Sequence, residues 1–157
     1  MKGQHTYKTN LKWTGNQGVG TASYKAFERS YTVSIANKPN LLGSSDQAFR
    51  GDPTKYNPEE LLVASLSSCH MLWYLHLCSE AGVIVTDYED NAIGAMMETA
   101  NGIGRFTCVT LRPTVTVSNL SMIEEANVLH KKANALCFIA NSVNFDIEHH
   151  PKCVYNP

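Results

Sequence analysis

A nearly continuous apolar stretch, Leu61 to Cys78, follows the segment Asn57-Pro58-Glu59-Glu60. The asparagine can cap a helix, the proline is tolerated at the first helical position, and Glu60 completes an Asn-x-x-Glu variant of the capping box. Gly82 supplies a stop signal, so the sequence predicts one helix over residues 57–82, about seven turns long. Because this helix is apolar on nearly every face, we expect it to be buried on nearly all sides.

A chain of 157 residues has few places to bury such a helix. We therefore expect a homodimer that packs two of these helices together. A membrane span is not expected, because polar side chains interrupt the stretch at Ser65, Ser67, Ser68, His70 and His76.

The composition indicates a globular protein, with 43% hydrophobic and 17% charged residues. Lys and Arg number 13 against 14 Asp and Glu, so no basic stripe is present and no nucleic-acid partner is expected. The first residues lack the apolar core of a signal peptide, and the five cysteines are odd in number and irregularly spaced. These features favour a cytoplasmic protein with reduced thiols.

Strand-like patterns flank the long helix on both sides. The dipeptide Asn101-Gly102 is a strong hairpin signal, and Ser121-Met122-Ile123-Glu124 reads as a second capping box. The predicted order is a single α+β domain over 1–157: N-terminal strands in 5–36, a loop at 37–56, the central helix 57–82, strands in 83–117, a helix at 121–140 and a final strand at 143–149. A loop as long as 37–56 within one domain is usually functional.

Two cysteines, Cys69 and Cys137, lie on the apolar stripes of their predicted helices. The two thiols can therefore meet in one dry site. The alternative is that each is a small hydrophobic residue of the core, since free cysteine is among the most buried residue types.

Position along the helix separates the possible roles of the two thiols. Cys69 is far from the start of its helix, so the helix dipole cannot stabilise its thiolate, and a cation from outside the helix must do so. Cys137 lies near a helix C-terminus, where the dipole disfavours a thiolate. The hypothesis is that Cys69 reacts first and Cys137 then attacks the oxidised sulfur.

These residues resemble the OsmC/Ohr family of hydroperoxide-reducing proteins, in its OsmC-like branch. The resemblance rests on Asn57-Pro58-Glu59-Glu60-Leu61-Leu62, then Cys69 and Glu80-Ala81-Gly82, and on Lys132-Ala133-Asn134-Ala135-Leu136-Cys137. It implies an α+β OsmC-like fold with antiparallel sheets around a long buried central helix, in an intertwined homodimer.

The activity implied by this resemblance is a thiol-dependent peroxidase that reduces organic hydroperoxides without a cofactor. Cys69 would become a sulfenic acid, Cys137 would resolve it to a disulfide, and an external dithiol, lipoyl in some members, would reduce that disulfide. Phe49, Trp73 and Phe138 suit the organic part of the substrate, although aromatic residues at such positions are also common in cores.

Glu59 matches the family glutamate that holds an arginine against the reactive thiolate. Glu59 is ten residues before Cys69, roughly 15 Å along a helix, so it cannot act on the thiol directly. An arginine can span that gap. The family position for this arginine is occupied by Ala48, so we expect Arg50 to take the role, with Arg29 as the second candidate.

Two other functions remain open. One is a non-catalytic, stress-related OsmC-like protein that binds a small apolar ligand, with Cys69 lining the pocket. The other is metal binding by the cluster His149-His150-Pro151-Lys152-Cys153, but adjacent histidines on a strand point to opposite faces, so no metal site is predicted. A second departure from the family is Phe138, which stands where many members have proline.

Overall fold

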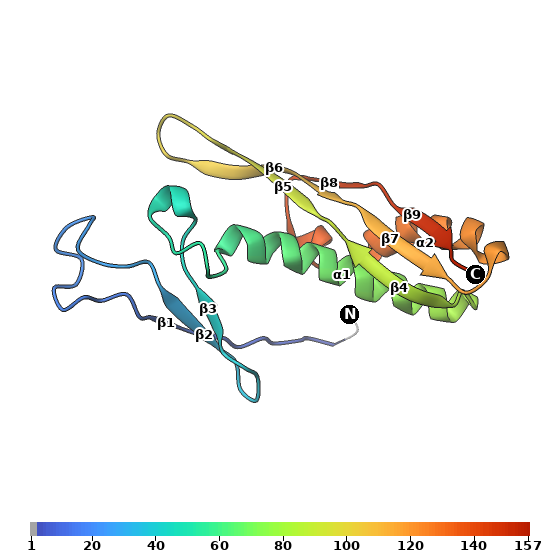
Figure 1. Cartoon of the computed structure of the whole chain (residues 1–157), viewed down its shortest axis with the longest axis horizontal. Helices are drawn as coiled ribbons and strands as arrows, with labels where there is room; N and C mark the ends of the chain where they lie inside the picture. The colour runs from blue at the N-terminus through green and yellow to red at the C-terminus, as the bar shows by residue number, and fades with distance from the viewer. Residues whose placement is uncertain (1–2) are drawn as a thin grey trace. The chain divides into compact units, whose positions relative to one another are not determined.

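The computed structural model describes residues 3–157 and divides the chain into two compact units, Met1–Leu61 and Leu62–Pro157. The first unit contains an antiparallel sheet of three short strands in the order β1-β2-β3 (Figure 1). These strands are β1 (Asn10–Trp13), β2 (Tyr31–Ser34) and β3 (Leu41–Gly43), and a short 3-10 helix, η1 (Gln47–Phe49), follows them.

The prediction of a loop throughout 37–56 is therefore wrong in part, because β3 and η1 lie within it. The β3 segment pairs with β2, with Leu41 opposite Val33 and Leu42 opposite Thr32. Pairing between strands is a non-local interaction, and the prolines and glycines around β3 hide it from a local reading of the sequence.

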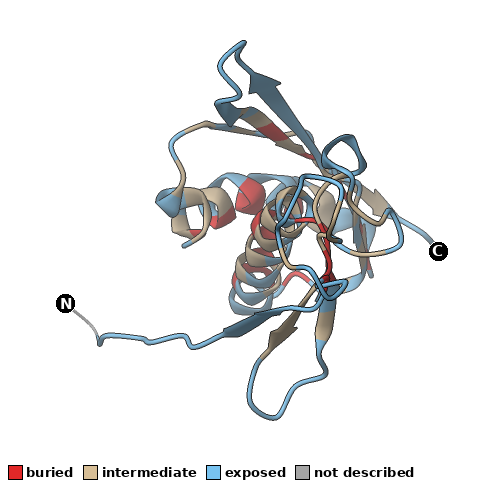
Figure 2. Ribbon diagram, turned by 90° about the vertical axis from the view of Figure 1, so that its left-hand side faces the viewer, coloured by how far each residue is buried: buried red, intermediate tan, exposed pale blue. Residues whose placement is uncertain are grey.

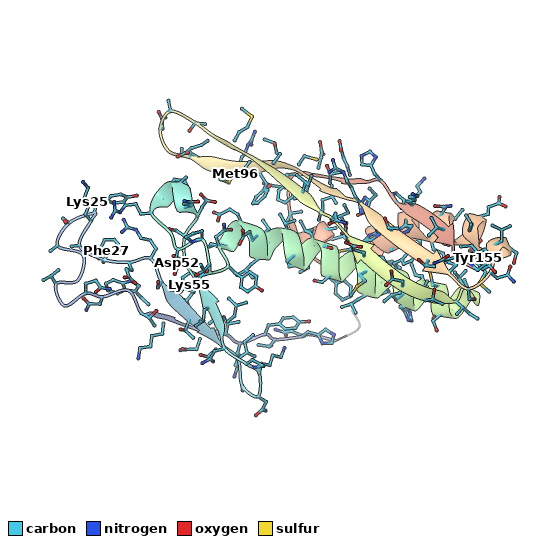
Figure 3. The ribbon with its side chains drawn as sticks, in the orientation of Figure 1. Lys25, Phe27, Asp52, Lys55, Met96 and Tyr155 are labelled. Carbon is cyan, nitrogen blue, oxygen red and sulfur yellow. The ribbon has the colours of Figure 1, made fainter. Side chains whose placement is uncertain are left out.

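A lysine fixes the segment that leads into the long helix. The Lys55 ammonium donates to the Ser30 hydroxyl oxygen at 2.8 Å and pairs with the Asp52 carboxylate at 3.0 Å (Figure 3). Hydrogen bonds from the side chain and backbone N–H of Thr54, and then from Lys55, lower the pKa of Asp52 to about 2. The carboxylate thus stays ionised and organises this turn.

Helix α1 (Pro58–Ala81) has the termini that the sequence predicts. The Glu60 backbone N–H donates to Asn57 Oδ1 at 2.8 Å, and the Asn57 backbone N–H donates to Glu60 Oε2 at 3.0 Å. Both bonds of the capping box are therefore formed. At the other end Gly82 takes φ +73°, and the Val83 N–H bonds to the Cys78 carbonyl at 2.9 Å.

Burial of α1 on all sides is not found in the single chain. Its buried residues are Leu66, His70, Tyr74, Leu77 and Cys78, and they share one side (Figure 2). Leu72 on another side is 63% exposed. Among the described residues α1 alone is long and apolar enough to cross a membrane, but its buried side packs into the core of the second unit.

The second unit contains two three-stranded sheets, in the orders β4-β7-β9 and β5-β6-β8. Only Arg112 separates β6 from β7, and only His150 and Pro151 separate β8 from β9. The strands are β4 (Val85–Asp90), β5 (Ile93–Glu98), β6 (Gly104–Leu111), β7 (Pro113–Val117), β8 (Asp146–His149) and β9 (Lys152–Tyr155).

The prediction of antiparallel sheets is wrong in part, because β8 pairs with β6 and β9 pairs with β7 in parallel. Strand β9 was not predicted, because the last strand expected from the sequence was placed at 143–149. Strand direction depends on how the chain returns to the sheet, which alternation within a strand does not encode.

The predicted hairpin at Asn101-Gly102 is confirmed between β5 and β6. Gly102 takes φ +76°, and its N–H bonds to the Thr99 carbonyl at 2.9 Å. The hairpin is largely exposed apart from its base (Figure 2), and Met96 lies on its exposed surface at 42% exposure.

Helix α2 (Ile123–Leu136) follows the 3-10 helix η2 (Leu120–Met122). The predicted capping box at Ser121 is wrong, because Asn119 accepts the Ser121 backbone N–H and hydroxyl, each at 2.9 Å. Asn119 caps the preceding 3-10 helix η2, so the capped segment starts earlier than the sequence predicts. The helix also ends at Leu136 rather than residue 140, and η3 (Ala140–Ser142) follows separately.

Both helices pack on the same face of the β4-β7-β9 sheet. The inward-facing Val115 and Val117 of β7 share one apolar cluster with Tyr74 and Leu77 of α1 and with Leu129 of α2. A second cluster joins the first half of α1 to β6 through Leu66, Val109 and Leu111. Two cores thus hold α1 along most of its length.

Candidate active site

The two cysteines singled out by the sequence meet inside the second unit. Cys69 is half-buried in the middle of α1, and Cys137 is 1% exposed at the end of α2. Burial, and then a hydrogen bond with the Cys69 thiol, raise the pKa of Cys137 to about 11. These effects outweigh the opposing one of the Ala140 backbone N–H, which donates to Cys137 Sγ at 3.4 Å. Cys137 is therefore a protonated thiol in contact with Cys69 at neutral pH.

The end of α2 gives Cys137 its place. The residue leaves the helix with φ −65° and ψ 115°, so its side chain projects from a cap position and not from a continuing turn. Asn141 closes the turn that follows: its backbone N–H donates to the Cys137 carbonyl at 3.0 Å, and its side-chain amide donates to the carbonyls of Ala135 and Cys137 at 3.0 and 2.9 Å. The early end of α2, which the sequence did not predict, thus places Cys137 at the junction between the helix and this turn.

Two of the three predicted pocket aromatics lie together beside the thiols. Trp73 is one turn after Cys69 on α1, and Phe138 follows Cys137 directly. Their ring centroids are 5.5 Å apart at 79°, an edge-to-face contact. Phe138 is 64% exposed, so this pair offers apolar surface to an organic molecule near the sulfurs. Phe49, the third, belongs to η1 in the first unit and is 40% exposed.

The predicted charged residues belong to the first unit. Arg50 follows η1 in a left-handed conformation, φ +66°, and its guanidinium carbon is 6.0 Å from the centre of the Tyr24 ring. Glu59 is half-buried in the first turn of α1 and raises the pKa of Tyr31, after the larger effect of burial.

Arg29, the second candidate, is already engaged within the first unit. Its guanidinium donates to the carbonyls of Phe27 and Tyr24 at 2.6 and 2.7 Å. It also stacks on both rings, at 4.2 and 4.3 Å from their centres. These contacts give Arg29 a structural role within the first unit.

Three histidines form a buried cluster next to the thiols, and the sequence did not predict that they lie together. His70 Nε2 lies 3.0 Å from His130 Nδ1, and the His149 ring centre is 4.6 Å from that of His70. His130 Nε2 lies 3.8 Å from Cys153 Sγ, and Tyr74 stacks on His130 at 3.8 Å. His70 is hydrogen-bonded in the core, and its neighbours in the cluster come from three other elements, α2, β8 and β9.

Burial keeps these histidines neutral. It is the largest effect that lowers the pKa of His70 to about 3 and that of His130 to about 4, and the neighbouring histidines add to it. It also lowers the pKa of His149, against the opposing effect of Asp90. The two adjacent histidines point to opposite faces, as the sequence predicts: His149 points inward, whereas His150 is exposed and its Nε2 lies 3.5 Å from the Glu148 carboxylate. No group of three or more His, Cys, Asp or Glu side chains in residues 3–157 is arranged to hold a metal ion.

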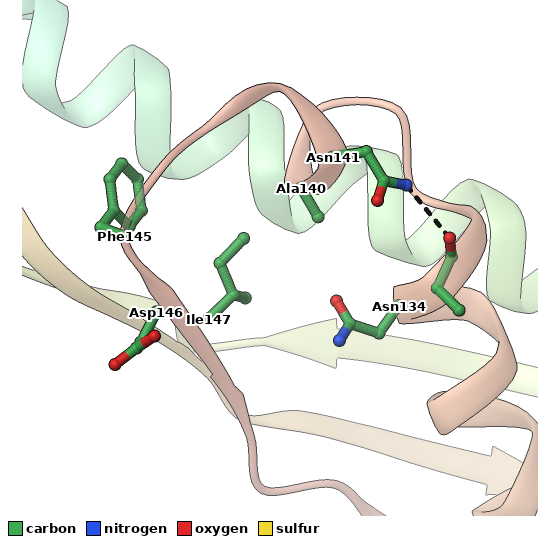
Figure 4. A pocket seen from close by; sticks show the side chains of 7 residues that line it. Asn134, Ala140, Asn141, Phe145, Asp146 and Ile147 are labelled. Carbon is green, nitrogen blue, oxygen red and sulfur yellow. Dashed lines mark hydrogen bonds between the residues drawn. The ribbon is translucent and has the colours of Figure 1, made fainter.

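A shallow pocket of about 230 Å³ lies at the end of α2 (Figure 4). Asn134, Asn141 and Asp146 give it polar walls, and Phe145 and Ile147 with two alanines complete the lining. Neither thiol lines this pocket, so the apolar surface of Trp73 and Phe138 is the better candidate for an organic substrate.

Comparisons with known proteins show the family and the fold. A family model described as OsmC-like protein matches residues 51–150. An OsmC-like protein of unknown function from Vibrio cholerae O1 biovar eltor is similar in structure, with a TM-score of 0.84 and 28% identity over 94% of this chain and 99% of that one.

Two organic hydroperoxide resistance proteins share the fold at lower identity. The one from Elizabethkingia anophelis has a TM-score of 0.70 and 20% identity over 99% of this chain and 100% of its own. The one from Legionella pneumophila, also described as OsmC, has a TM-score of 0.67 and 18% identity over 96% and 98%. Among curated proteins, none matches the chain.

Proposed function

Because the chain belongs to the OsmC-like protein family, we propose that it is a cysteine-based peroxidase that reduces organic hydroperoxides to alcohols. The observation that carries the proposal is the contact between Cys69 and Cys137, two thiols from different helices. Neighbouring thiols that are both free in a partly dry site can form a disulfide after one of them is oxidised.

The reaction we propose has two steps on the protein. The Cys69 thiolate attacks the terminal oxygen of the hydroperoxide, the O–O bond breaks, and the alkoxide leaves as an alcohol after taking a proton. Cys69 is then a sulfenic acid. Cys137 Sγ attacks this sulfur, and its proton leaves with the hydroxyl group as water while the S–S bond forms.

The environments of the two thiols support this order. Cys69 is half-buried and lies one turn before Trp73, whose ring contacts the exposed ring of Phe138. A substrate can therefore approach Cys69, whereas Cys137 is buried. The raised pKa of Cys137 makes it a poor first nucleophile but leaves it a proton to give to the departing hydroxide. An external dithiol, such as a reduced lipoyl group, would then reduce this disulfide, become a disulfide itself and restore both protein thiols.

We further propose a homodimer, since one side of α1 remains uncovered in the single chain and Leu72 on it is 63% exposed. Sedimentation should give a mass about twice the 17.3 kDa of one chain. A mass of one chain at micromolar concentration contradicts this part of the proposal.

The test of the function is a thiol titration of the purified wild-type protein. One equivalent of cumene hydroperoxide should remove two titratable thiols and create one link between Cys69 and Cys137 within a chain, seen by peptide mass spectrometry, with release of one equivalent of alcohol. An unchanged thiol count would instead favour a protein that binds a small apolar ligand without chemistry.

Arg50 is our candidate for the cation that stabilises the Cys69 thiolate, with Glu59 holding its guanidinium. Removing a positive group that stabilises a reacting anion typically slows the chemical step about 100-fold. Arg50→Met should therefore slow oxidation of Cys69 by about that factor, measured under single-turnover conditions by the decay of hydroperoxide.

Arg105→Met is the matched control, because Arg105 lies on the exposed β5–β6 hairpin and should leave the rate unchanged. Arg29→Met completes the set. If it slows the reaction and Arg50→Met does not, the role belongs to Arg29.

A further inference from the structure

The histidine pair His70–His130 joins the two helices that carry the reactive thiols. His70 follows Cys69 directly on α1, and His130 is seven residues, or two turns, before Cys137 on α2. Residues two turns apart on a helix share a face, so His130 and Cys137 both look toward α1. The histidine pair is not part of the proposed chemistry.

Three contacts between α1 and α2 follow one another in opposite sequence order. The Tyr74 hydroxyl donates to the Ala126 carbonyl at 3.1 Å, His70 bonds to His130 at 3.0 Å, and Cys69 contacts Cys137. The helices therefore run past each other in one defined register. The histidine contact is the one next to the sulfurs.

The histidine contact is directional, unlike the apolar packing around it. Both side chains are nearly inaccessible, at 1% and 2% exposure, and one ring nitrogen donates while the other accepts. Leucines and alanines at this position could slide along each other with little change in energy, whereas a buried hydrogen bond that slips leaves two polar nitrogens unpaired. Tyr74 and Cys153 hold His130 from its other sides.

We propose that the His70–His130 hydrogen bond is a positioning element for disulfide formation: it holds α1 and α2 in the register that keeps the sulfurs of Cys69 and Cys137 in contact. The proposal rests on the proposed function, because it assigns a determinant of that function's second step. Both histidines act through the helices that carry the two thiols, so they are positioning residues and not catalytic ones.

The test measures how readily Cys69 and Cys137 form a disulfide, without any peroxide. In glutathione redox buffers one protein dithiol and one glutathione disulfide give one protein disulfide and two glutathione thiols. The equilibrium constant is the effective concentration of the two thiols toward each other. Cys78, Cys108 and Cys153 are replaced by serine throughout, so that only this pair reacts.

His130→Leu should lower the effective concentration about 10- to 100-fold, since a displacement near 1 Å has effects of this size. His130→Asn keeps a polar atom near the Nδ1 position that bonds to His70, and should restore the value to within about threefold of the parent. His149→Leu is the matched control: it removes a third imidazole of the same buried cluster but not the bond between α1 and α2, and should leave the value unchanged.

A general loss of stability would lower the melting temperature of all three variants, but their effective concentrations would then not differ from one another. An unchanged value in folded His130→Leu, or an equal fall in His149→Leu, overturns the proposal. If His130→Leu does not fold, His130→Gln replaces it, because the Gln amide lies one methylene farther out than the Asn amide. An effective concentration in His130→Gln equal to that in His130→Asn would then overturn the proposal. Failure of the peroxidase proposal would be seen separately, as wild-type protein that peroxide does not oxidise.

Discussion

Cys69→Ser is expected to abolish hydroperoxide reduction, with a fall in rate of about a thousandfold or more. A serine hydroxyl cannot take the oxygen of a peroxide at neutral pH, because it is neither ionised nor polarisable like a thiolate. The substitution should leave the fold intact, since Cys69 is half-buried and its exchange removes little packing. The measurement is loss of hydroperoxide under turnover with a dithiol reductant.

Cys137→Ser should give a different result from the same assay. The first oxidation of Cys69 should proceed at nearly the wild-type rate, because Cys137 is protonated and takes no part until the sulfenic acid exists. Without a resolving thiol the sulfenic acid should accumulate, which dimedone labelling and a mass increase of one oxygen would detect.

Cys108→Ser is the control for this pair of variants. Cys108 lies on β6, half-buried, and its sulfur is 3.8 Å from the Thr110 hydroxyl, so it has no contact with Cys69 or Cys137 among the described side chains. Its replacement should preserve turnover and disulfide formation. Full activity of Cys69→Ser would contradict the assignment of the first nucleophile, and rapid disulfide formation in Cys137→Ser would mean that another cysteine resolves.

The second large effect is acid destabilisation by the buried histidines. His70 and His130 have pKa values of about 3 and 4 in the folded chain, and 6.5 is the ordinary value that each regains on unfolding. The unfolded chain therefore binds more protons as soon as the pH falls below about 6.5. Stability that is fully present above this pH is lost progressively as the pH falls toward 4.

The size of the effect follows from the linkage relation. Between pH 6.5 and pH 5 each histidine should lower the free energy of unfolding by about 2 kcal/mol, or about 4 kcal/mol for the two as an upper bound. His149, whose pKa burial also lowers, should add to this. Asp52 does not contribute in this window, because its pKa is lowered and its stabilising effect is lost only as the pH falls below about 4, toward 2.

The groups that face the histidines set the sign of this prediction. Tyr74 of α1 and Cys153 of β9 lie against His130. The charges of Asp90 and His150 act on His149, and among the described residues Asp90 is the one carboxylate that acts on the cluster. One carboxylate does not compensate for three buried imidazolium ions. Burial therefore decides, and acid destabilises the fold.

Urea unfolding at pH 7.5, 6.5, 5.5 and 5.0 measures this dependence. His130→Asn should reduce the slope by about one proton, whereas His76→Asn should not change it, since His76 is exposed and lies on the outer side of α1. A free energy of unfolding that is constant from pH 7.5 to 5.0 would show that the cluster is not the buried neutral group we describe.

Much of the candidate site could be predicted because its signals are local. The capping box at Asn57 and Glu60, the stop at Gly82 and the apolar periodicity around Cys69 depend on residues within a few positions of one another. Such interactions act the same way in any fold, so they predicted where α1 begins and ends. The hairpin turn at Gly102 belongs to the same class.

The errors fall where interactions are not local. Strands β3 and β9 exist because partners distant in sequence pair with them, and the parallel pairings of β8 and β9 follow from the path of the returning chain. Helix α2 ends four residues early because Asn141 binds the carbonyls of Ala135 and Cys137 and stabilises a turn. None of these contacts leaves a periodic trace in the sequence.

Helical periodicity is enough to place Cys69 and Cys137 on the apolar sides of two helices, so this part of the site could be predicted from the sequence. The hydrogen bond between the two thiols, and the gathering of His70, His130 and His149 into one neutral cluster, are visible only in the folded chain. Contact between elements depends on their packing register, and this register is set by the summed burial and hydrogen bonding of all of them at once.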